Sequence, residues 1–226
     1  MKYIIFDLDE TIFNHTNGEK NGLKDIHIKY FEVYGISYEN FHHNFSEFNK
    51  LSWENFENGI QNIEATLSNR FKLLCEFYEI EIDLLNLLKD YTASYIRNCI
   101  PYIGAKALLN ELLNMGFVLG VCSNGLERIQ FDKMKYHNIE KCFSFFQFGS
   151  EFPSCKPNQY FFTHMLNDLK VEPQEILLIG DSLTNDIIPA EKSGMKTLHI
   201  NEEYLIGGEL QCTLILNKLE EMIVLS

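Results

Sequence analysis

Two aspartates near the N-terminus are the residues from which a chemical function can first be argued. Asp7 and Asp9 follow the apolar run Tyr3 to Phe6, which is typical of a strand buried on both faces of a parallel sheet. Because they are two residues apart, their carboxylates point to one side of an extended chain, at the strand end where open α/β sheets bind ligands. Like charges this close repel, so such a site usually holds a cation or keeps one acid protonated. An acidic turn after a strand is the alternative interpretation.

A second polar segment, Ser123-Asn124-Gly125, follows the apolar run Phe117 to Cys122. A hydroxyl together with backbone N–H groups that a glycine makes accessible suits phosphoryl oxygens. Taken alone, the same three residues are also a common turn.

Lys156 and two more aspartates come from the last third of the chain. Lys156 precedes Pro157, which favours an extended lysine just before a helix, although most lysines lie on the surface. Asp181 and Asp186 follow the apolar run Ile176 to Ile179, although Asp181 or Asn185 could instead cap the next helix. The four carboxylates outnumber this one lysine, and a divalent cation would offset the excess charge. We expect Mg²⁺, because the donors are hard carboxylate oxygens with no histidine or thiolate beside them.

The elements that position these groups fall into two classes. Residues 14–22 are polar and rich in turn formers, which indicates a connector. Apolar residues spaced three and four apart then predict an all-helical insertion. Its expected helices are Leu23 to Tyr34, Glu39 to Phe56, Ile63 to Tyr78 and Leu84 to Cys99.

From Pro101 onward, helices and strands alternate, which is typical of βαβ units. The predicted helices are Ala105 to Met115, Leu126 to His137, Pro157 to Leu169, Asn185 to Lys192 and Leu216 to Val224, and the predicted strands are Phe117 to Cys122, Phe143 to Phe148, Ile176 to Ile179 and Thr197 to Ile200. We therefore expect an α/β fold with a doubly wound, Rossmann-like parallel sheet. Residues 1–13 and 101–226 would form the core domain, and residues 14–100 an inserted four-helix domain.

Composition narrows the class of partner. The formal net charge of −13 argues against general affinity for nucleic acid or anionic membrane. Apolar runs are too short to span a membrane, and Asp7 and Asp9 come too early for a secretory signal, so we expect a cytoplasmic protein. The six cysteines show no C-x-x-C spacing, which favours buried reduced thiols. We expect a small anionic ligand, and a monomer or a homodimer.

Four motifs in this order resemble the haloacid dehalogenase superfamily of phosphohydrolases. They are Asp7-Leu8-Asp9-Glu10-Thr11, Ser123-Asn124, Lys156-Pro157 and Gly180-Asp181-Ser182-Leu183-Thr184-Asn185-Asp186. The resemblance covers the whole core and implies that the helical insertion is the family's cap domain. It implies that Asp7 is the nucleophile that forms an aspartyl-phosphate. Asp9 would protonate the leaving oxygen and later take a proton from the attacking water.

The resemblance also implies the binding roles. Lys156, Ser123 and the amides of Asn124 and Gly125 would bind the phosphoryl oxygens. Mg²⁺ would be held by the Asp7 side chain, the Asp9 backbone carbonyl and Asp181. Asp186 would bind the metal directly or support it, and Thr11 would support the Asp9 loop.

The cap sequence indicates a substrate class. The segment 49–59, with Arg70-Phe71 and the segment 101–105, resembles the house-cleaning pyrimidine 5′-nucleotidases. That implies a small phosphorylated metabolite as substrate, a nucleoside 5′-monophosphate with pyrimidine preference. Trp53 and Arg70 are candidates for substrate specificity, although Arg70 could instead form a salt bridge within the cap. Phe41, Phe45 and Phe48 share one helical face, which favours cap core over base stacking.

Three alternatives remain open at this point. The first is a general small-metabolite phosphatase acting on phosphoglycolate or sugar phosphates, and the second is a sugar phosphomutase. The third is a non-catalytic regulatory protein that binds phosphate and Mg²⁺. Asp9 argues against the third alternative, and also against the family's dehalogenases and phosphonatases, which lack this second aspartate.

Overall fold

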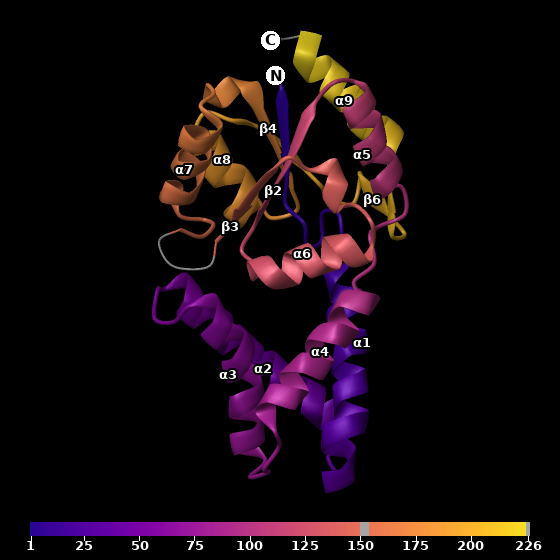
Figure 1. Ribbon diagram of the computed structural model, residues 1–226, viewed down its shortest axis with the longest axis vertical. Helices are drawn as coiled ribbons and strands as arrows, with labels where there is room; N and C mark the ends of the chain where they lie inside the picture. Colours follow the sequence, from indigo (N-terminus) through magenta and orange to yellow (C-terminus); the bar gives the residue numbers. More distant parts are fainter. Residues whose placement is uncertain (150–153, 225–226) are drawn as a thin grey trace.

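The computed structural model describes residues 1–149 and 154–224, and it places a parallel sheet above a group of helices formed by residues 15–98 (Figure 1). The sheet has the order β3-β2-β1-β4-β5, and every neighbouring pair is parallel. Its strands are β1 (Tyr3–Phe6), β2 (Val118–Ser123), β3 (Phe145–Phe148), β4 (Ile176–Gly180) and β5 (Lys196–His199). β1 is the central strand, and β2 and β4 lie on either side of it. The chain segments that follow these three strands therefore meet at the carboxyl end of the sheet.

Both faces of the sheet are buried, as the continuous apolar strands predict. Ile4 and Phe6 point to one face, and Ile5 points to the other. The first face is covered by α5 (Ala105–Asn114), α6 (Glu127–Tyr136) and α9 (Cys212–Val224), and the second by α7 (Gln159–Leu169) and α8 (Ile188–Lys192). This arrangement confirms the predicted doubly wound α/β fold with an inserted set of helices.

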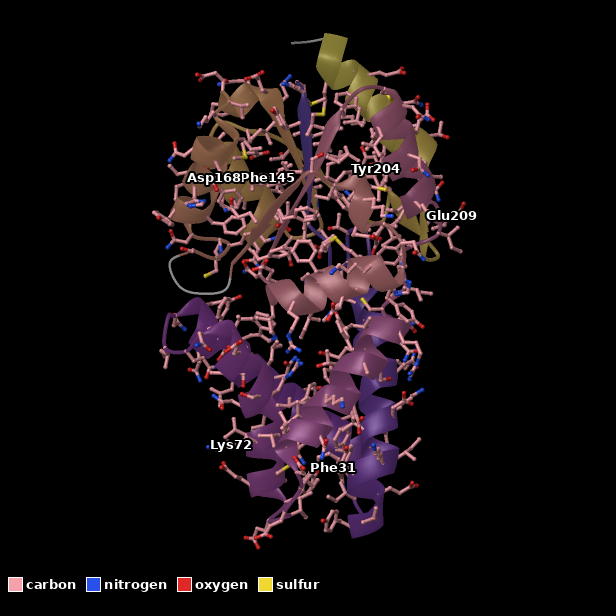
Figure 2. All side chains as sticks on the ribbon, viewed as in Figure 1. Phe31, Lys72, Phe145, Asp168, Tyr204 and Glu209 are labelled. Carbon is pink, nitrogen blue, oxygen red and sulfur yellow. The ribbon has the colours of Figure 1, made fainter. Side chains whose placement is uncertain are left out.

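The inserted helices begin where the sequence supplies a capping side chain. They are α1 (His15–Ile26), α2 (Tyr38–Glu57), α3 (Ile63–Phe77) and α4 (Leu84–Asn98). Asn14, Ser37, Asn62 and Asp83 each accept a hydrogen bond from the backbone N–H three residues later. Helix α1 packs against α4, and α2 packs against α3. Phe31 lies inside this group of helices, whereas Lys72 lies on its outside (Figure 2).

The predicted connector at residues 14–22 is wrong, because α1 starts at His15 and continues through a π-helical turn, His27–Phe31. The two glycines that suggested a turn lie on the helix face that α4 approaches. A Cβ atom at Gly18 would lie 2.6 Å from the Cβ of Cys99, and one at Gly22 would lie 3.1 Å from the Tyr91 ring. Close packing of two helices, not a turn, explains both glycines.

Three further predictions need correction. The final helix begins at Cys212 rather than at Leu216. Pro157 is not in the first turn of its helix, because α7 begins at Gln159 with Asn158 as its N-cap. The predicted helix from Asn185 to Lys192 starts earlier, with a π-helical turn at Leu183–Ile187 that leads into α8. The sequence reading also missed a short hairpin of β6 (Leu205–Ile206) and β7 (Glu209–Leu210).

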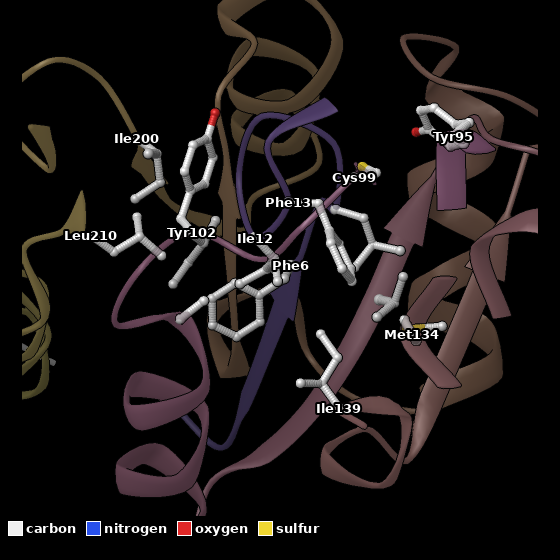
Figure 3. Close-up of a cluster of buried hydrophobic side chains, with 14 of the residues drawn as sticks. Phe6, Ile12, Phe13, Tyr95, Cys99, Tyr102, Met134, Ile139, Ile200 and Leu210 are labelled. Carbon is white, nitrogen blue, oxygen red and sulfur yellow. The ribbon is translucent and has the colours of Figure 1, made fainter. Parts of the chain in front are cut away.

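The chain passes between the sheet and the helical insertion twice, and Glu10 contacts both crossings. Its carboxylate accepts a hydrogen bond from the Thr16 N–H (2.5 Å) at the start of α1 and another from the Tyr102 hydroxyl after α4. Phe13 and Tyr102 flank these crossings within one buried cluster, together with Met134 of α6 (Figure 3). Within the described part of the chain, no helix has the length and apolar character needed to cross a membrane.

Candidate active site

Asp7 and Lys156 meet at the carboxyl end of the central strand. The Lys156 ammonium donates to Asp7 (2.7 Å) and to Asp186 (2.5 Å), and it lies 3.3 Å from the Cys122 carbonyl oxygen. Lys156 is 3% exposed, and Asp186 is 1% exposed. A buried charge has to be paired to be tolerated, so the lysine and the two carboxylates stabilise one another. Residues 149 positions apart in the chain therefore share one buried ionic cluster.

The oxygen donors at the carboxyl ends of β1 and β4 fit a divalent cation. Carboxylate oxygens of Asp7, Asp181 and Asp186 all lie within 4.8 Å of one another. Thr11 joins the group, since its hydroxyl lies 3.4 Å from a carboxylate oxygen of Asp7 and 3.4 Å from one of Asp181. Thr11 thus contacts these two acids rather than the Asp9 side chain. Three hard oxygen donors without a histidine or thiolate suit Mg²⁺.

The pKa values of the acids in this group also favour a bound cation. Burial raises the pKa of Asp7, the nearby carboxylates add to the rise, and Lys156 only partly opposes it. Burial and the charge of Asp186 raise the pKa of Asp181 to about 6. Both acids therefore hold protons more tightly than an ordinary aspartate, chiefly because they are buried and also because other carboxylates lie beside them. A bound cation would offset their negative charge.

Asp9 lies beside the acidic group in a different environment. Gln130 donates to one of its carboxylate oxygens (2.7 Å), and the other accepts hydrogen bonds from Lys133 and from the Tyr95 hydroxyl (3.2 Å). The His15 ring nitrogen is 3.8 Å from the same oxygen. Burial alone would raise the pKa of Asp9, but the charges of Lys133 and His15 and the hydrogen bonds from Lys133 and Gln130 outweigh it and lower the pKa.

Gln130 and Lys133 are site residues that the sequence reading missed. Both lie on α6, three positions apart, so they project from the same helix face. Lys133 is completely buried, and its ammonium lies 4.6 Å from the Phe13 ring centre. The sequence carried no signal for its burial, because a lysine on a helix is normally exposed. With Lys133, two lysines rather than one face the four carboxylates.

The Ser123-Asn124-Gly125 segment is a compact turn at the end of β2. The Ser123 hydroxyl accepts from the Gly125 N–H (3.1 Å) and from Gln130 (3.0 Å), which leaves its own proton free to donate. The Asn124 side chain exchanges two hydrogen bonds with the Lys156 backbone, at 2.7 and 2.8 Å. Asn124 therefore fixes Lys156 relative to β2.

Asp181 remains available for binding because a neighbouring residue caps the helix. The Ser182 hydroxyl accepts from the Asn185 N–H (3.1 Å), so Ser182 is the cap rather than Asp181. Asp186 lies against the end of β4, since a Cβ at Gly180 would be 2.6 Å from its carboxyl carbon. A glycine is needed at position 180 for Asp186 to reach the site.

A cavity of about 380 Å³ opens over these residues and extends to the helical insertion. Asp7, Ser123 and Asp181 line its sheet side, and Trp53 and Leu88 line its helical side. Arg70 also lines the cavity, but its guanidinium donates to Asn49 (3.0 Å) and to the Leu67 carbonyl (3.2 Å), and it lies 3.8 Å from Glu19. Arg70 therefore forms the ion pair within the insertion that the sequence left open as an alternative.

Comparison with known proteins places this geometry in a family. The family described as haloacid dehalogenase-like hydrolase matches residues 4–200. Pyrimidine 5′-nucleotidase YjjG of Escherichia coli is 25% identical over 203 residues, which are 89% of this chain and 87% of that protein. Glyceraldehyde 3-phosphate phosphatase of Methanocaldococcus jannaschii is 26% identical over 200 residues, 88% of this chain and 85% of that protein.

A solved structure shows the same fold. The putative HAD-hydrolase YfnB of Bacillus subtilis, described as bound to magnesium, superimposes with a TM-score of 0.79 at 23% identity, covering 96% of this chain and 97% of that one. The order of the motifs, the doubly wound sheet with its helical insertion and the family match over residues 4–200 agree. The chain belongs to the haloacid dehalogenase-like hydrolases.

Proposed function

We propose that this protein is a Mg²⁺-dependent phosphomonoesterase that acts on nucleoside 5′-monophosphates, with preference for pyrimidines. The observation that carries the chemistry is the contact of Asp7 with Lys156 beside Asp181 and Asp186. Residues 1–13 and 101–226 form the catalytic core in this proposal, and residues 14–100 form the cap. The related pyrimidine 5′-nucleotidase supports the substrate class.

In the first step, an Asp7 carboxylate oxygen attacks phosphorus and the bond from phosphorus to the leaving oxygen breaks. Asp9 donates a proton to that oxygen, so the product leaves as an alcohol rather than an alkoxide. Lys133 favours the ionised form of Asp9 in the free enzyme, so the negative charge of the bound phosphoryl group has to raise the pKa of Asp9 before this step. Lys156, the Ser123 hydroxyl and the amides of Asn124 and Gly125 bind the phosphoryl oxygens, whose negative charge would otherwise repel Asp7.

In the second step, water attacks phosphorus while Asp9 takes its proton, which releases phosphate and restores the Asp7 carboxylate. Asp7, Asp181 and the Asp9 backbone carbonyl would hold Mg²⁺, with Asp186 binding directly or orienting its neighbours. The bound cation supplies positive charge against the repulsion between nucleophile and phosphate. Thr11 and Lys156 keep the Asp7 carboxylate oriented, each through one of its two oxygens.

The helical side of the cavity suits the leaving group. Trp53 packs edge to face on the buried Phe56, with ring centres 5.6 Å apart, and lines the cavity with Leu67 and Leu88. An aromatic ring and apolar walls favour a planar base over a small polar acid. The cavity volume of about 380 Å³ lies within the range of roughly 300–1000 Å³ found for small-molecule sites.

A panel of phosphate esters tests the substrate class. With Mg²⁺ present, kcat/KM is expected to be highest for uridine and thymidine 5′-monophosphates, lower for purine nucleotides, and lowest for phosphoglycolate and hexose phosphates. Equal or better hydrolysis of phosphoglycolate or a hexose phosphate would contradict the nucleotide proposal.

The second candidate is a phosphatase of small phosphorylated metabolites. The glyceraldehyde 3-phosphate phosphatase relative favours it, because its identity to this chain is as high as that of the nucleotidase. With a triose phosphate added to the panel, the highest kcat/KM for that ester would support this candidate. Transfer of phosphate within a sugar, without free phosphate, would indicate a mutase.

A further inference from the structure

Helix α6 carries a pair of residues that contact the two oxygens of Asp9 separately. The Gln130 amide donates to one oxygen, and the Lys133 ammonium binds the other. The same Gln130 nitrogen lies 3.0 Å from the Ser123 hydroxyl, so one side chain joins Asp9 to a residue at the phosphate-binding edge. We call Gln130 and Lys133 the α6 clamp.

The environment of Lys133 is unusual for a lysine on an amphipathic helix. Its side chain has no solvent exposure, and its ammonium lies over the rings of Phe13 (4.6 Å) and Tyr95 (5.6 Å). Among residues 1–149 and 154–224, Asp9 is its only ion-pair partner. The walls around the ammonium therefore direct it toward a single carboxylate.

Stability alone does not explain such a pair. Removing two charges from water costs several kcal/mol each, and replacing a buried ion pair with apolar side chains is often neutral or stabilising. An apolar residue at position 133 would suit α6, where the adjacent Met134 is fully buried. A fixed carboxylate, in contrast, is what proton transfer requires, because the acid has to lie within hydrogen-bond reach of the leaving oxygen.

We propose that Lys133 and Gln130 are positioning residues, which hold Asp9 in the orientation from which it exchanges protons with the leaving group and with water. This inference rests on the proposed role of Asp9. Neither clamp residue touches the phosphoryl group. Lys133 acts through the Asp9 carboxylate alone, whereas Gln130 contacts both that carboxylate and Ser123. Loss of Lys133 should therefore resemble a partial loss of Asp9 itself.

The test compares two substrates that differ in their need for an acid. The leaving group of uridine 5′-monophosphate is uridine, which is a poor leaving group as an alkoxide and therefore needs a proton. The leaving group of 4-nitrophenyl phosphate is 4-nitrophenolate, which is stable without a proton. We use kcat/KM, because it reports events up to departure of the leaving group. Lys133→Met should lower kcat/KM for the nucleotide by about 10²-fold, the low end of general acid catalysis. It should change kcat/KM for 4-nitrophenyl phosphate little.

The matched control is Lys135→Met, which removes an exposed lysine from the same helix and should leave both substrates unaffected. Gln130→Leu provides a second variant with the ion pair intact. Because it also removes the contact with Ser123, it should lower kcat/KM for both substrates, and more for the nucleotide. The combination Asp9→Asn with Lys133→Met is decisive. If Lys133 acts through Asp9, adding Lys133→Met to Asp9→Asn should not lower kcat/KM for the nucleotide any further.

Two results would overturn the positioning role. One is that Lys133→Met lowers kcat/KM equally for both substrates. The other is that Lys133→Met lowers kcat/KM for the nucleotide as much in the Asp9→Asn background as it does in the wild type. Failure of the proposed function looks different. In that case the wild-type enzyme releases phosphate from neither ester, or Asp9→Asn affects both esters equally, and the inference falls with it.

Discussion

Two aspartates that are neighbours in the sequence have opposite electrostatic surroundings. Asp7 belongs to a group of acids that share Lys156, and its pKa is raised, whereas Asp9 faces Lys133 and Gln130, and its pKa is lowered. Separate partners keep the two carboxylates from competing for one cation. The proposed roles require the reverse order of pKa values, because a nucleophile has to be ionised and an acid protonated. A cation bound to Asp7 would lower its pKa, and the negative charge of a bound phosphoryl group would raise that of Asp9.

Asp181 supplies a prediction about pH. Its pKa rises from 3.8 to about 6 on folding, so it binds a proton more tightly in the folded state. It therefore stabilises the protein below about pH 4, and this stabilisation is lost as the pH rises toward 6. Without Mg²⁺, Asp181→Asn should be as stable as the wild type near pH 4 and more stable near pH 7. Urea unfolding at both pH values measures this difference.

Mg²⁺ should reverse that order at pH 7. A cation that binds only the folded state raises Tm, and it requires the deprotonated carboxylates. The rise in Tm on adding Mg²⁺ should be larger at pH 7 than at pH 5, and smaller in Asp181→Asn than in the wild type. An Asp181→Asn protein that is less stable than the wild type at pH 7 without metal, or that gains as much from Mg²⁺, would contradict this assignment.

At the same scale, the limits of sequence reasoning are visible in Lys133. Asp7, Ser123 and Asp181 could be predicted because each follows an apolar strand, and parallel strands align their carboxyl ends. Lys133 could not be predicted in the same way, because a lysine on a helix is normally exposed. Only the fold shows that this helix face lies on Asp9.

At the scale of elements, α1 and α4 depend on the small size of Gly18. Alanine normally favours a helix over glycine by about 1 kcal/mol. At position 18, however, a Cβ would lie 2.6 Å from the Cβ of Cys99. We therefore expect Gly18→Ala to lower the free energy of unfolding by about 1–3 kcal/mol, as overpacking does. Denaturant unfolding measures the change.

Lys20→Ala is the control for this prediction, because Lys20 is exposed on the same helix. It should change the free energy of unfolding by no more than about 0.5 kcal/mol. A Gly18→Ala protein that is more stable than the wild type would show that helix propensity outweighs the contact with α4, and that the packing argument is wrong.

The elements differ in how well the sequence predicted them. The five strands of the sheet agree with the prediction to within about two residues, because continuous apolar runs mark most of them. The helices α2 to α5 agree equally well, because their hydrophobic periodicity is strong. For residues 14–22 the sequence predicts a connector because glycines commonly form turns, whereas the spacing of four between Gly18 and Gly22 puts them on one helix face. The β6–β7 hairpin was missed because each strand has only two residues, although Gly207 and Gly208 supply the positive φ angles of its turn.

At the scale of the whole molecule, a small hydrophobic cluster joins the helical insertion to the core. Phe56 and Ile63, at the α2–α3 end of the insertion, pack with Cys155 and Leu126 of the core, and Trp53 packs on the same cluster. These contacts lie beside the cavity, so the insertion forms a wall of the site in this structure. The base of a nucleotide would then meet Trp53 while its phosphate meets Asp7.

Trp53→Leu tests that arrangement. Loss of an aromatic stacking partner costs roughly 1–3 kcal/mol per base, so KM for uridine 5′-monophosphate should rise about 10-fold or more. Acetyl phosphate has no base, and its kcat/KM should stay the same. Phe77→Leu is the matched control, because Phe77 is exposed on α3 and does not line the cavity. Equal effects of Trp53→Leu on both substrates would indicate a packing defect instead of base recognition.

The central claim is that Asp7 becomes phosphorylated during turnover. The most direct measurement is acid quenching of the enzyme with Mg²⁺ and uridine 5′-monophosphate labelled at phosphorus, followed by mapping of the labelled peptide. We predict covalent label on the peptide that contains Asp7, and neither label nor phosphate release in Asp7→Asn. The control Asp168→Asn, at an exposed acid on α7, should behave as the wild type. Label on another peptide, or undiminished phosphate release by Asp7→Asn, would contradict the account.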